Sequence, residues 1–292
     1  MKPARQTTII PDAAEQSPYT TSTRSIRKFQ EMILSYYRLH GRDLPWRRTT
    51  DPYAILVSEI MLQQTQVPRV LEKFPQFTNT FPDFPALAAA PLPQLLTAWQ
   101  GMGYNRRALA LKKCAVRVVD EFGGRLPADP EILSTFPGIG KATASSICAF
   151  AFNMPVLFIE TNIRRVFIHF FFSGSNTVTD RDIFPLVEQA LYRNDPCTWY
   201  NALMDLGTDL KTRVPNPNRR SSGYTRQPAF EGSDRKIRGE ILRLLLVKGE
   251  LSRETLLGTI TEDPDRVARI LSDLMKEGFI AEHQSSFIIA QH

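Results

Sequence analysis

A glutamate and three polar side chains stand together in an otherwise apolar part of the sequence. Glu59 lies in the mainly apolar stretch 55–62, and Gln63, Gln64 and Thr65 follow directly. A carboxyl group among apolar neighbours is costly unless it serves a pocket, where it can act as a general acid. A glutamate on a solvated helix face is the commoner arrangement, so these residues alone leave both interpretations open.

A second carboxyl group, Glu160, ends the apolar run 156–159, and Asn162 follows two residues later. A charged residue in such a place is either a reactive carboxylate or the cap of the next helix. Capping is the usual outcome, because the free N–H groups at a helix start favour a negative charge. The sequence by itself does not choose between these roles.

A glycine-rich turn between two apolar segments predicts a DNA contact. Gly138 and Gly140 allow backbone conformations closed to other residues, and Lys141 and Thr143 stand at the start of the next expected helix. Free N–H groups at a helix start can hold a phosphate. We therefore expect a helix-hairpin-helix that grips DNA without reading its sequence, although a glycine turn can also be merely structural.

These residues need helices to position them, and the apolar spacing is almost entirely helical from Ser25 onward. One helix is predicted to begin behind Ser25. A second follows Asp51 and is expected to carry Glu59, Gln63 and Gln66 on one face. Further helices are predicted over residues 92–99, 106–122, 130–135, 142–152, 161–171, 181–192 and 196–210. The main body is therefore predicted to be all-α.

Composition divides the chain into four parts. Residues 1–24 are polar and are predicted to be a disordered tail, and residues 25–212 form the helical body. Prolines, glycines and serines mark residues 213–232 as a linker. Beyond it, residues 233–292 predict three helices and a hairpin, an arrangement typical of a small winged-helix domain, which either binds DNA or packs on a neighbour.

Charge and cysteine content narrow the function classes. The formal net charge is +6, and its excess lies in residues 1–210 and in the segment 211–232, which contains Arg219 and Arg220, so a polyanion such as DNA is the expected partner. The N-terminus lacks an apolar signal core and no stretch is long enough to cross a membrane, which predicts a cytoplasmic protein. Three cysteines and four scattered histidines predict no metal site and no cofactor.

Five short motifs occur together in one order. They are Leu44-Pro45-Trp46-Arg47, the Glu59 segment 58–67, Gly101-Met102-Gly103-Tyr104, Pro137-Gly138-Ile139-Gly140 and Met204-Asp205-Leu206-Gly207. Over roughly residues 26–212 they resemble the helix-hairpin-helix DNA glycosylase superfamily of the endonuclease III and MutY type. The Glu59 segment is the most specific of the five matches.

The resemblance implies a role for each polar residue. Glu59 matches the acid that protonates a departing adenine at N7, and Asn162 matches an asparagine beside the reacting sugar. Glu160 stands where the superfamily has an aspartate that stabilises the sugar cation, so its longer side chain shifts or weakens that site. Gln63 and Tyr104 match the residues that fill the stack when a base is rotated out of the duplex.

Three departures modify the expectation. Ala142 occupies the position of the lysine with which endonuclease III cleaves the strand, so we expect no lyase step. The four-cysteine cluster loop after Gly207 is replaced by an arginine-rich segment, in which Arg219 and Arg220 are expected to hold phosphates. The nudix-like domain that reads the opposite base in MutY is replaced by the predicted winged helix.

The sequence thus predicts a monofunctional DNA glycosylase that releases a flipped-out base, with adenine in a mispair as the favoured substrate. Uracil, mispaired thymine and oxidised purines remain alternatives on the same scaffold. A catalytically inactive protein that binds lesions is the alternative from another class, because of the glutamate at position 160. The expected partner is double-stranded DNA with a damaged or mispaired base, bound by a monomer associated with a bacterial-type nucleoid.

Overall fold

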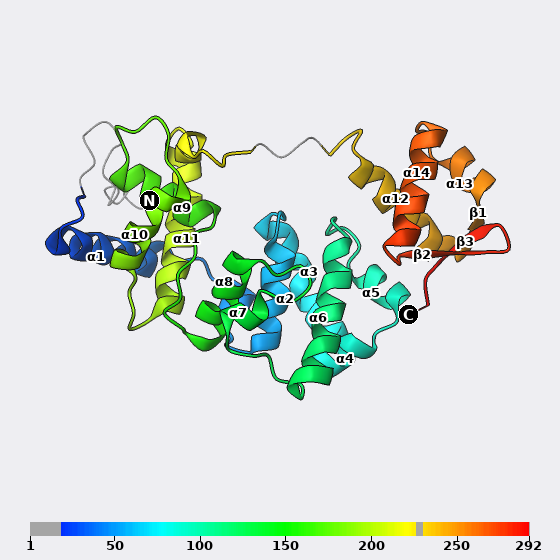
Figure 1. The fold of residues 1–292 in the computed structure, drawn as a ribbon, viewed down its shortest axis with the longest axis horizontal. Coiled ribbons are helices and arrows are strands. Elements are labelled where there is room, and N and C mark those ends of the chain that lie inside the picture. Colours follow the sequence, from blue (N-terminus) through cyan, green and yellow to red (C-terminus); the bar gives the residue numbers. More distant parts are fainter. Residues whose placement is uncertain (1–18, 226–229, 292) are drawn as a thin grey trace, which may run out of the picture. The chain divides into compact units, whose positions relative to one another are not determined.

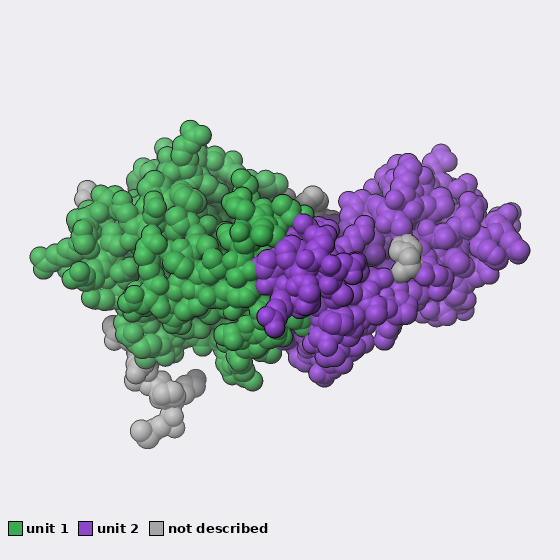
Figure 2. Space-filling model, turned by 60° about the horizontal axis from the view of Figure 1, so that its bottom comes forward, with its two compact units in different colours: residues 1–55, 128–135, 139–226 green, residues 56–127, 136–138, 227–292 purple. Residues whose placement is uncertain are grey.

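The computed structural model describes residues 19–225 and 230–291, which form two compact units (Figure 2). The first unit comprises residues 1–55, 128–135 and 139–226, and the second comprises residues 56–127, 136–138 and 227–292. Residues 1–18 of the predicted tail and 226–229 of the predicted linker lie outside the described part of the chain.

The first unit is built from six helices and two short 3-10 turns (Figure 1). They are α1 (Thr23–His40), η1 (Pro45–Arg47), α7 (Pro130–Leu133), α8 (Lys141–Phe152), α9 (Thr161–Phe171), α10 (Asp180–Ala190), α11 (Pro196–Arg213) and η2 (Pro217–Arg220). Its core is aromatic: the ring of Phe29 makes edge contacts with Phe167, Phe170 and Trp199, and all four side chains are buried. Phe170 and Trp199 are therefore core residues, as their apolar neighbours in the sequence predict.

Residues 19–24, which the sequence predicts to be part of a disordered tail, have a defined structure. Ser22, rather than Ser25, caps α1 by accepting a hydrogen bond from the Ser25 backbone N–H. Ahead of it, the Tyr19 ring packs edge-on against Phe29. An aromatic residue in a polar segment can be held by a distant core, which local composition does not reveal.

The second unit begins within α2 (Pro52–Leu62) and continues through four more helices. These are α3 (Val67–Thr80), α4 (Phe84–Ala89), α5 (Leu92–Ala98) and α6 (Arg106–Phe122). The sequence analysis did not predict α3 or α4. The prolines of this region hid them, because Pro75 lies inside α3, yet Val70, Phe74 and Phe77 still give that helix one continuous buried face.

The same unit contains a small module over residues 233–291, here called the C-terminal module. It consists of α12 (Asp234–Lys248), β1 (Glu250–Ser252), α13 (Arg253–Thr259), α14 (Pro264–Lys276), β2 (Ile280–His283) and β3 (Ser286–Ile289). The strands form an antiparallel sheet in the order β1-β3-β2, with Leu251 opposite Phe287 and Ala281 opposite Ile288. The hairpin was predicted, strand β1 was not, and the winged-helix interpretation stays a prediction.

The mainly helical fold class is confirmed, with strands confined among the described residues to the C-terminal module and one isolated bridge between Val178 and Ser221. Across the described ranges no helix has both the length and the apolar character needed to span a lipid bilayer.

Candidate active site

Glu59 lies in the last turn of α2, between the buried residues Ser58 and Ile60, and is itself partly buried. The helix ends at Leu62, so the expectation that Glu59, Gln63 and Gln66 share one helical face is wrong. Gln64 has a φ of 54°, which breaks the helical path, and Gln66 directly precedes α3 without a side-chain hydrogen bond to the helix start. Gln63, Gln64 and Thr65 instead form a tight turn just beyond the glutamate.

One buried guanidinium group shapes that turn. Nη1 of Arg107 donates to the carbonyl oxygens of Ile60, Met61 and Gln63 at 2.5–3.0 Å. These carbonyls belong to the open C-terminal end of α2, where an arginine is favoured by the helix dipole. Nη2 donates to Thr65 Oγ1 at 2.9 Å. Arg107 thus fixes the backbone on both sides of Gln63 and Gln64.

Arg107 also joins this turn to a second one. Its Nη2 donates to the carbonyls of Met102 and Gly103, both at 3.1 Å, and its guanidinium carbon lies 5.4 Å from the ring centre of Tyr104. Burial lowers the pKa of Arg107 to about 10. Tyr104 has a φ of 49°, a left-handed conformation that is unusual for a tyrosine, so the turn holds this side chain at a conformational cost.

The sequence analysis missed Arg107, although a signal was present. On α6 it falls on the same stripe as the buried residues Leu111, Cys114 and Val118, four, seven and eleven positions later. An arginine on an apolar stripe needs partners inside the protein.

The predicted hairpin is present between α7 and α8. Gly138 has a φ of 74°, and a Cβ atom there would lie 2.8 Å from Cβ of Ala110, so both the backbone angle and the space require glycine. The carbonyl of Gly138 accepts a hydrogen bond from Gln63 Nε2 at 3.2 Å, which brings a predicted wedge residue to the hairpin. Gly140 precedes the first turn of α8, where Lys141 is exposed and Thr143 is partly buried.

Glu160 caps α9. Its Oε1 accepts hydrogen bonds from the backbone N–H groups of Asn162 at 2.7 Å and Ile163 at 2.9 Å, while Oε2 accepts a longer bond of 3.4 Å from Asn162 Nδ2. Burial raises the pKa of this carboxyl group, and the two backbone hydrogen bonds oppose that rise. The extra methylene of glutamate lets the side chain fold back over the helix start.

The amide of Asn162 is fixed from its other side. Its Oδ1 accepts a hydrogen bond from Arg165 Nη1 at 2.6 Å, and the same nitrogen donates to the carbonyl of Gly207 at 2.5 Å. A Cβ atom on Gly207 would lie 2.4 Å from the Asn162 carbonyl oxygen. Helices α9 and α11 therefore touch where only glycine fits, and that contact locates the asparagine.

Two of the five motifs meet at a buried carboxylate. Asp205 accepts hydrogen bonds from the backbone N–H and Nε of Arg42, both at 2.7 Å, and from both terminal nitrogens of Arg47 at 2.8 Å. Its side chain is only 1% exposed. This cluster, here called the Asp205 clasp, ties α11 to the segment that follows α1, so these two motifs have a structural role.

Comparison with known proteins places this arrangement in a family. The family model described as "HhH-GPD superfamily base excision DNA repair protein" matches residues 57–186. The adenine DNA glycosylase of Mycobacterium tuberculosis (strain H37Rv) is 32% identical over 274 residues, covering 85% of this chain and 88% of that protein. The chain belongs to this superfamily.

A further relative and two solved structures are also similar to this chain. The adenine DNA glycosylase of Mycolicibacterium smegmatis is 33% identical over 268 residues, covering 86% of this chain and 92% of that protein. A solved thermostable thymine-DNA glycosylase is 25% identical, with a TM-score of 0.60 over 68% of this chain and 93% of that one. Endonuclease III in a trapped covalent DNA complex, at 17% identity, shares the fold, with a TM-score of 0.56 over 66% of this chain and 90% of that one.

Membership in this superfamily of base excision repair proteins makes the chain a DNA-binding protein. The arginine-rich segment 214–224 is the part in which the sequence predicts phosphate contacts. Arg220 Nη1 donates to the carbonyls of Phe172 and Ser173, and Nη2 donates to Ile168. Arg220 thus covers the C-terminal end of α9 and is occupied there, whereas Arg219 is exposed. Of the two arginines predicted to hold phosphates, only Arg219 presents its side chain to solvent.

The rest of this segment is anchored on α9 as well. Asn216 Oδ1 accepts a hydrogen bond from Arg165 Nε at 3.2 Å, and Asn218 Nδ2 donates to the Thr161 carbonyl at 2.8 Å. The first half of the predicted linker is therefore part of the first unit. Its prolines, glycines and serines made it look like a flexible connection in the sequence.

The three cysteines lie on three different helices. Cys114 lies on α6, Cys148 on α8 and Cys197 on α11, and burial raises the pKa of Cys114 to about 12 and that of Cys148 to about 11. Within the described ranges no three histidine, cysteine or acidic side chains gather in a way that could hold a metal ion. His169 is buried against the Phe170 ring, 4.7 Å between ring centres, and is therefore a core residue.

Proposed function

We propose that this protein is a monofunctional adenine DNA glycosylase that acts on mispaired adenine in double-stranded DNA, as a monomer in the cytoplasm. The observation that carries the proposal is the placement of Glu59 at the end of α2, directly before a turn that Arg107 fixes with hydrogen bonds. Relatives that match most of the chain and are named adenine DNA glycosylase support the same substrate.

In this proposal Glu59 is the general acid. Its carboxyl group donates a proton to N7 of the flipped adenine, so the base leaves as a neutral molecule when the N-glycosidic bond breaks. The electrons of that bond go to the base, and the sugar becomes an oxocarbenium ion. Water then adds to C1′ and loses a proton, which leaves an abasic site and free adenine.

Glu160 is proposed to stabilise the sugar cation in its ionised form. Its Oε1 is committed to two backbone N–H groups, so Oε2 is the atom that can face the developing positive charge. Asn162 donates to Oε2 and is itself held by Arg165, which makes it a positioning residue for Glu160. The cap and the electrostatic role, which the sequence presents as alternatives, are compatible because they use different oxygen atoms.

The contacts to DNA are proposed from the two turns and the hairpin. Gln63, Gln64 and Tyr104 are expected to enter the space of the extruded base, and Thr65 keeps its turn in shape through Arg107. The backbone at Gly138 and Gly140 and the side chains of Lys141 and Thr143 are expected to hold phosphates, and Arg219 adds a further contact. These contacts do not depend on the DNA sequence.

Absence of a lyase step is part of the proposal. Strand cleavage by this superfamily's bifunctional members needs an amine that attacks C1′, and Ala142 cannot supply one. Lys141 precedes it on α8, and neighbouring residues of a helix point about 100° apart.

A second candidate substrate has its own support. The solved thymine-DNA glycosylase shares 25% of its residues with this chain and aligns over 68% of it, so thymine in a mispair must be tested beside adenine. Uracil and oxidised purines belong in the same panel because pocket residues alone separate such activities.

The test is a cleavage assay on labelled duplexes with A opposite 8-oxoguanine, A opposite G, T opposite G, U opposite G and 8-oxoguanine opposite C. Strand breaks only after alkali, only with adenine, and lost at least a hundredfold in Glu59→Gln, are the expected result. The control is Glu131→Gln, an exposed glutamate on α7, which should cleave like the natural chain. Salt-sensitive binding without cleavage of any duplex would favour the inactive lesion-binding protein instead.

A further inference from the structure

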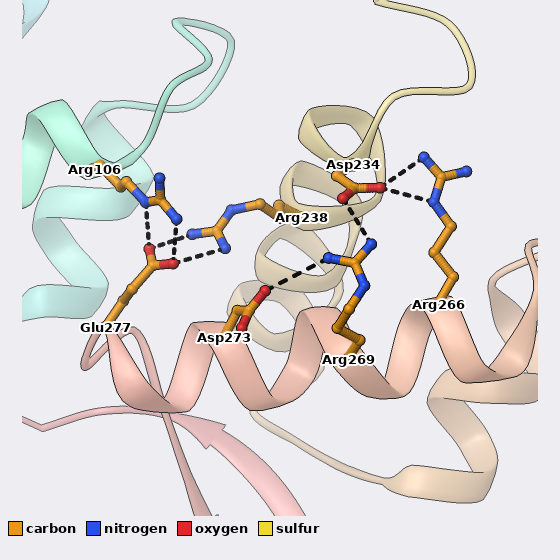
Figure 3. A network of polar contacts seen from close by, with 7 residues as sticks. All are labelled: Arg106, Asp234, Arg238, Arg266, Arg269, Asp273 and Glu277. Carbon is orange, nitrogen blue, oxygen red and sulfur yellow. Dashed lines mark hydrogen bonds and ion pairs between the residues drawn. The ribbon is translucent and has the colours of Figure 1, made fainter.

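One contact between the C-terminal module and the helical part of the second unit is made by a carboxylate. Glu277, at the end of α14, accepts hydrogen bonds from Arg106 Nε at 2.8 Å and Nη2 at 2.6 Å (Figure 3). Arg238 of α12 donates to the same carboxylate at 3.1 and 2.5 Å. Partial burial by itself would raise the pKa of Glu277, but these arginines lower it. One carboxylate thus links two elements of the module to the start of α6.

A second contact lies close by in the sequence. Nη1 of Arg235, one turn before Arg238 on α12, donates to the hydroxyl of Tyr104, and its guanidinium carbon lies 5.1 Å from the centre of that ring. Arg107 lies over the same ring at 5.4 Å. Tyr104 is therefore held by one arginine from α6 and by one from the C-terminal module.

Two other arginines of the module are arranged differently. Arg266 and Arg269 of α14 both pair with Asp234 of α12, at 2.6 and 2.8 Å, so their charges are balanced inside the module (Figure 3). Arg235 is the module's contact with the residue that the proposed function places in the DNA stack. Arg266 and Arg269 therefore stabilise the module itself, whereas Arg235 contacts a residue outside it.

We propose that the C-terminal module holds Tyr104 ready for DNA, with Arg235 as the positioning residue and the Glu277 pair with Arg106 as the joint that keeps Arg235 in place. The inference rests on the proposed function, because it assigns the module a part in base extrusion. It also gives the module a task other than binding DNA directly.

The physical reason is preorganisation. A tyrosine whose ring and hydroxyl are both held has fewer conformations to lose when it enters the duplex. A guanidinium over an aromatic ring contributes about 0.5–2 kcal/mol, depending on exposure. Loss of that contact therefore corresponds to an about twofold to thirtyfold change in the equilibrium between stacked and extruded base.

The first experiment measures extrusion by the fluorescence of 2-aminopurine placed as the target base opposite 8-oxoguanine, with saturating protein. Arg235→Met should lower the extruded fraction about fivefold, and Arg235→Lys should restore part of it. The matched control is Arg269→Met, a half-exposed arginine of the same module, which should extrude the base like the natural chain. Equal fluorescence for Arg235→Met and the natural chain would overturn the inference.

The second experiment needs no DNA. A double-mutant cycle of Arg235→Met and Tyr104→Phe, followed by thermal unfolding, should show non-additive shifts in Tm, because each change removes the same hydrogen bond. A parallel cycle of Arg106→Met and Glu277→Gln should also be non-additive. Additive shifts in both cycles would overturn the hold on Tyr104 whatever the enzyme does.

The two proposals fail separately. If the natural chain extrudes no purine while the cycles show coupling, the adenine glycosylase proposal falls and the hold of Arg235 on Tyr104 stands. If the natural chain excises adenine and Arg235→Met excises and extrudes it equally well, the proposed function stands and this inference falls.

Discussion

Two buried charges organise the two units, and they are stabilised in different ways. In the first unit, the Asp205 carboxylate meets two arginines, so opposite charges face each other. In the second unit, the Arg107 guanidinium meets carbonyl oxygens, one hydroxyl and two aromatic rings, at 5.5 Å from Trp99 and 5.4 Å from Tyr104. The Asp205 clasp depends on charge, whereas the Arg107 site depends on the planar arrangement of the N–H donors of the guanidinium group.

This difference follows from the structural role of each site. The clasp joins helices, and any geometry that keeps the ion pairs serves that purpose. The Arg107 site must keep two turns in defined conformations, and a planar group with several fixed donors can bind many carbonyls at once. A buried ion pair secures packing, whereas a buried guanidinium among dipoles sets backbone geometry.

The largest effect is expected from breaking the clasp. Asp205→Ala leaves Arg42 and Arg47 facing a buried site without a counter-charge, which should lower the free energy of unfolding by about 3–5 kcal/mol. Urea unfolding measures the loss. The exposed pair between Asp43 and Arg48 provides the control, and Asp43→Ala should leave the midpoint unchanged. A small loss for Asp205→Ala would show that the clasp does not depend on charge.

Exchanging arginine for lysine tests the difference directly. Arg107→Lys should cost about 2–4 kcal/mol, because one ammonium group cannot reach the carbonyls of both turns and leaves several unsatisfied. Arg47→Lys keeps an ion pair with Asp205 and should cost about 1 kcal/mol. The free energies of unfolding of the two variants, measured under the same conditions, decide the point. Equal losses would contradict the distinction between charge and shape.

The next largest effect on stability is expected at Gly207, where α9 and α11 are in close contact. Gly207→Ala pushes a methyl group to within 2.4 Å of the Asn162 carbonyl and should lower stability by about 1–3 kcal/mol, with a loss of activity through the displaced asparagine. Gly239→Ala, on the open side of α12, should instead raise stability by about 0.5–1 kcal/mol. Opposite signs in thermal unfolding would confirm that space at residue 207, and not helix propensity, is decisive.

The smallest effect concerns pH. Because the folded-state pKa of Glu160 is raised, its contribution to stability is fully present below the ordinary glutamate pKa and is lost as pH rises through the raised value. The Tm of Glu160→Gln relative to the natural chain should therefore increase from pH 4 to pH 8. Asp182, whose pKa the Thr179 side-chain hydrogen bond lowers, contributes stability above the ordinary aspartate pKa and loses it as pH falls, so the Tm of Asp182→Asn relative to the natural chain should increase from pH 5 to pH 3. A flat difference for Glu160→Gln would contradict the raised pKa.

Local patterns predicted the elements well where the helices carry clear apolar stripes. Helices α6 and α9 begin and end at the predicted residues. Prediction failed where tertiary packing outweighs local signals. Helix α3 contains a proline, and α2 stops at Leu62 although the apolar and polar spacing continues to Gln66.

The candidate site shows the same limit. Glu59, Glu160 and the hairpin glycines could be found from motifs, because their chemistry needs those residue types. The roles of Arg107, Arg165 and Arg235 depend on partners distant in the chain, from 42 to 131 positions away, and no local pattern contains them. The hydrogen bonds that connect Glu160 through Asn162 and Arg165 to Gly207 could not be predicted for the same reason.

The left-handed backbone of Gln64 and Tyr104 has an evolutionary consequence. A glycine at either position would relieve about 1–2 kcal/mol of backbone strain. It would also erase the side chain that the proposed function sends into the duplex. Selection for thermal robustness and selection for repair therefore act in opposite directions at these two residues, and variants adapted to heat should gain their stability elsewhere in the chain.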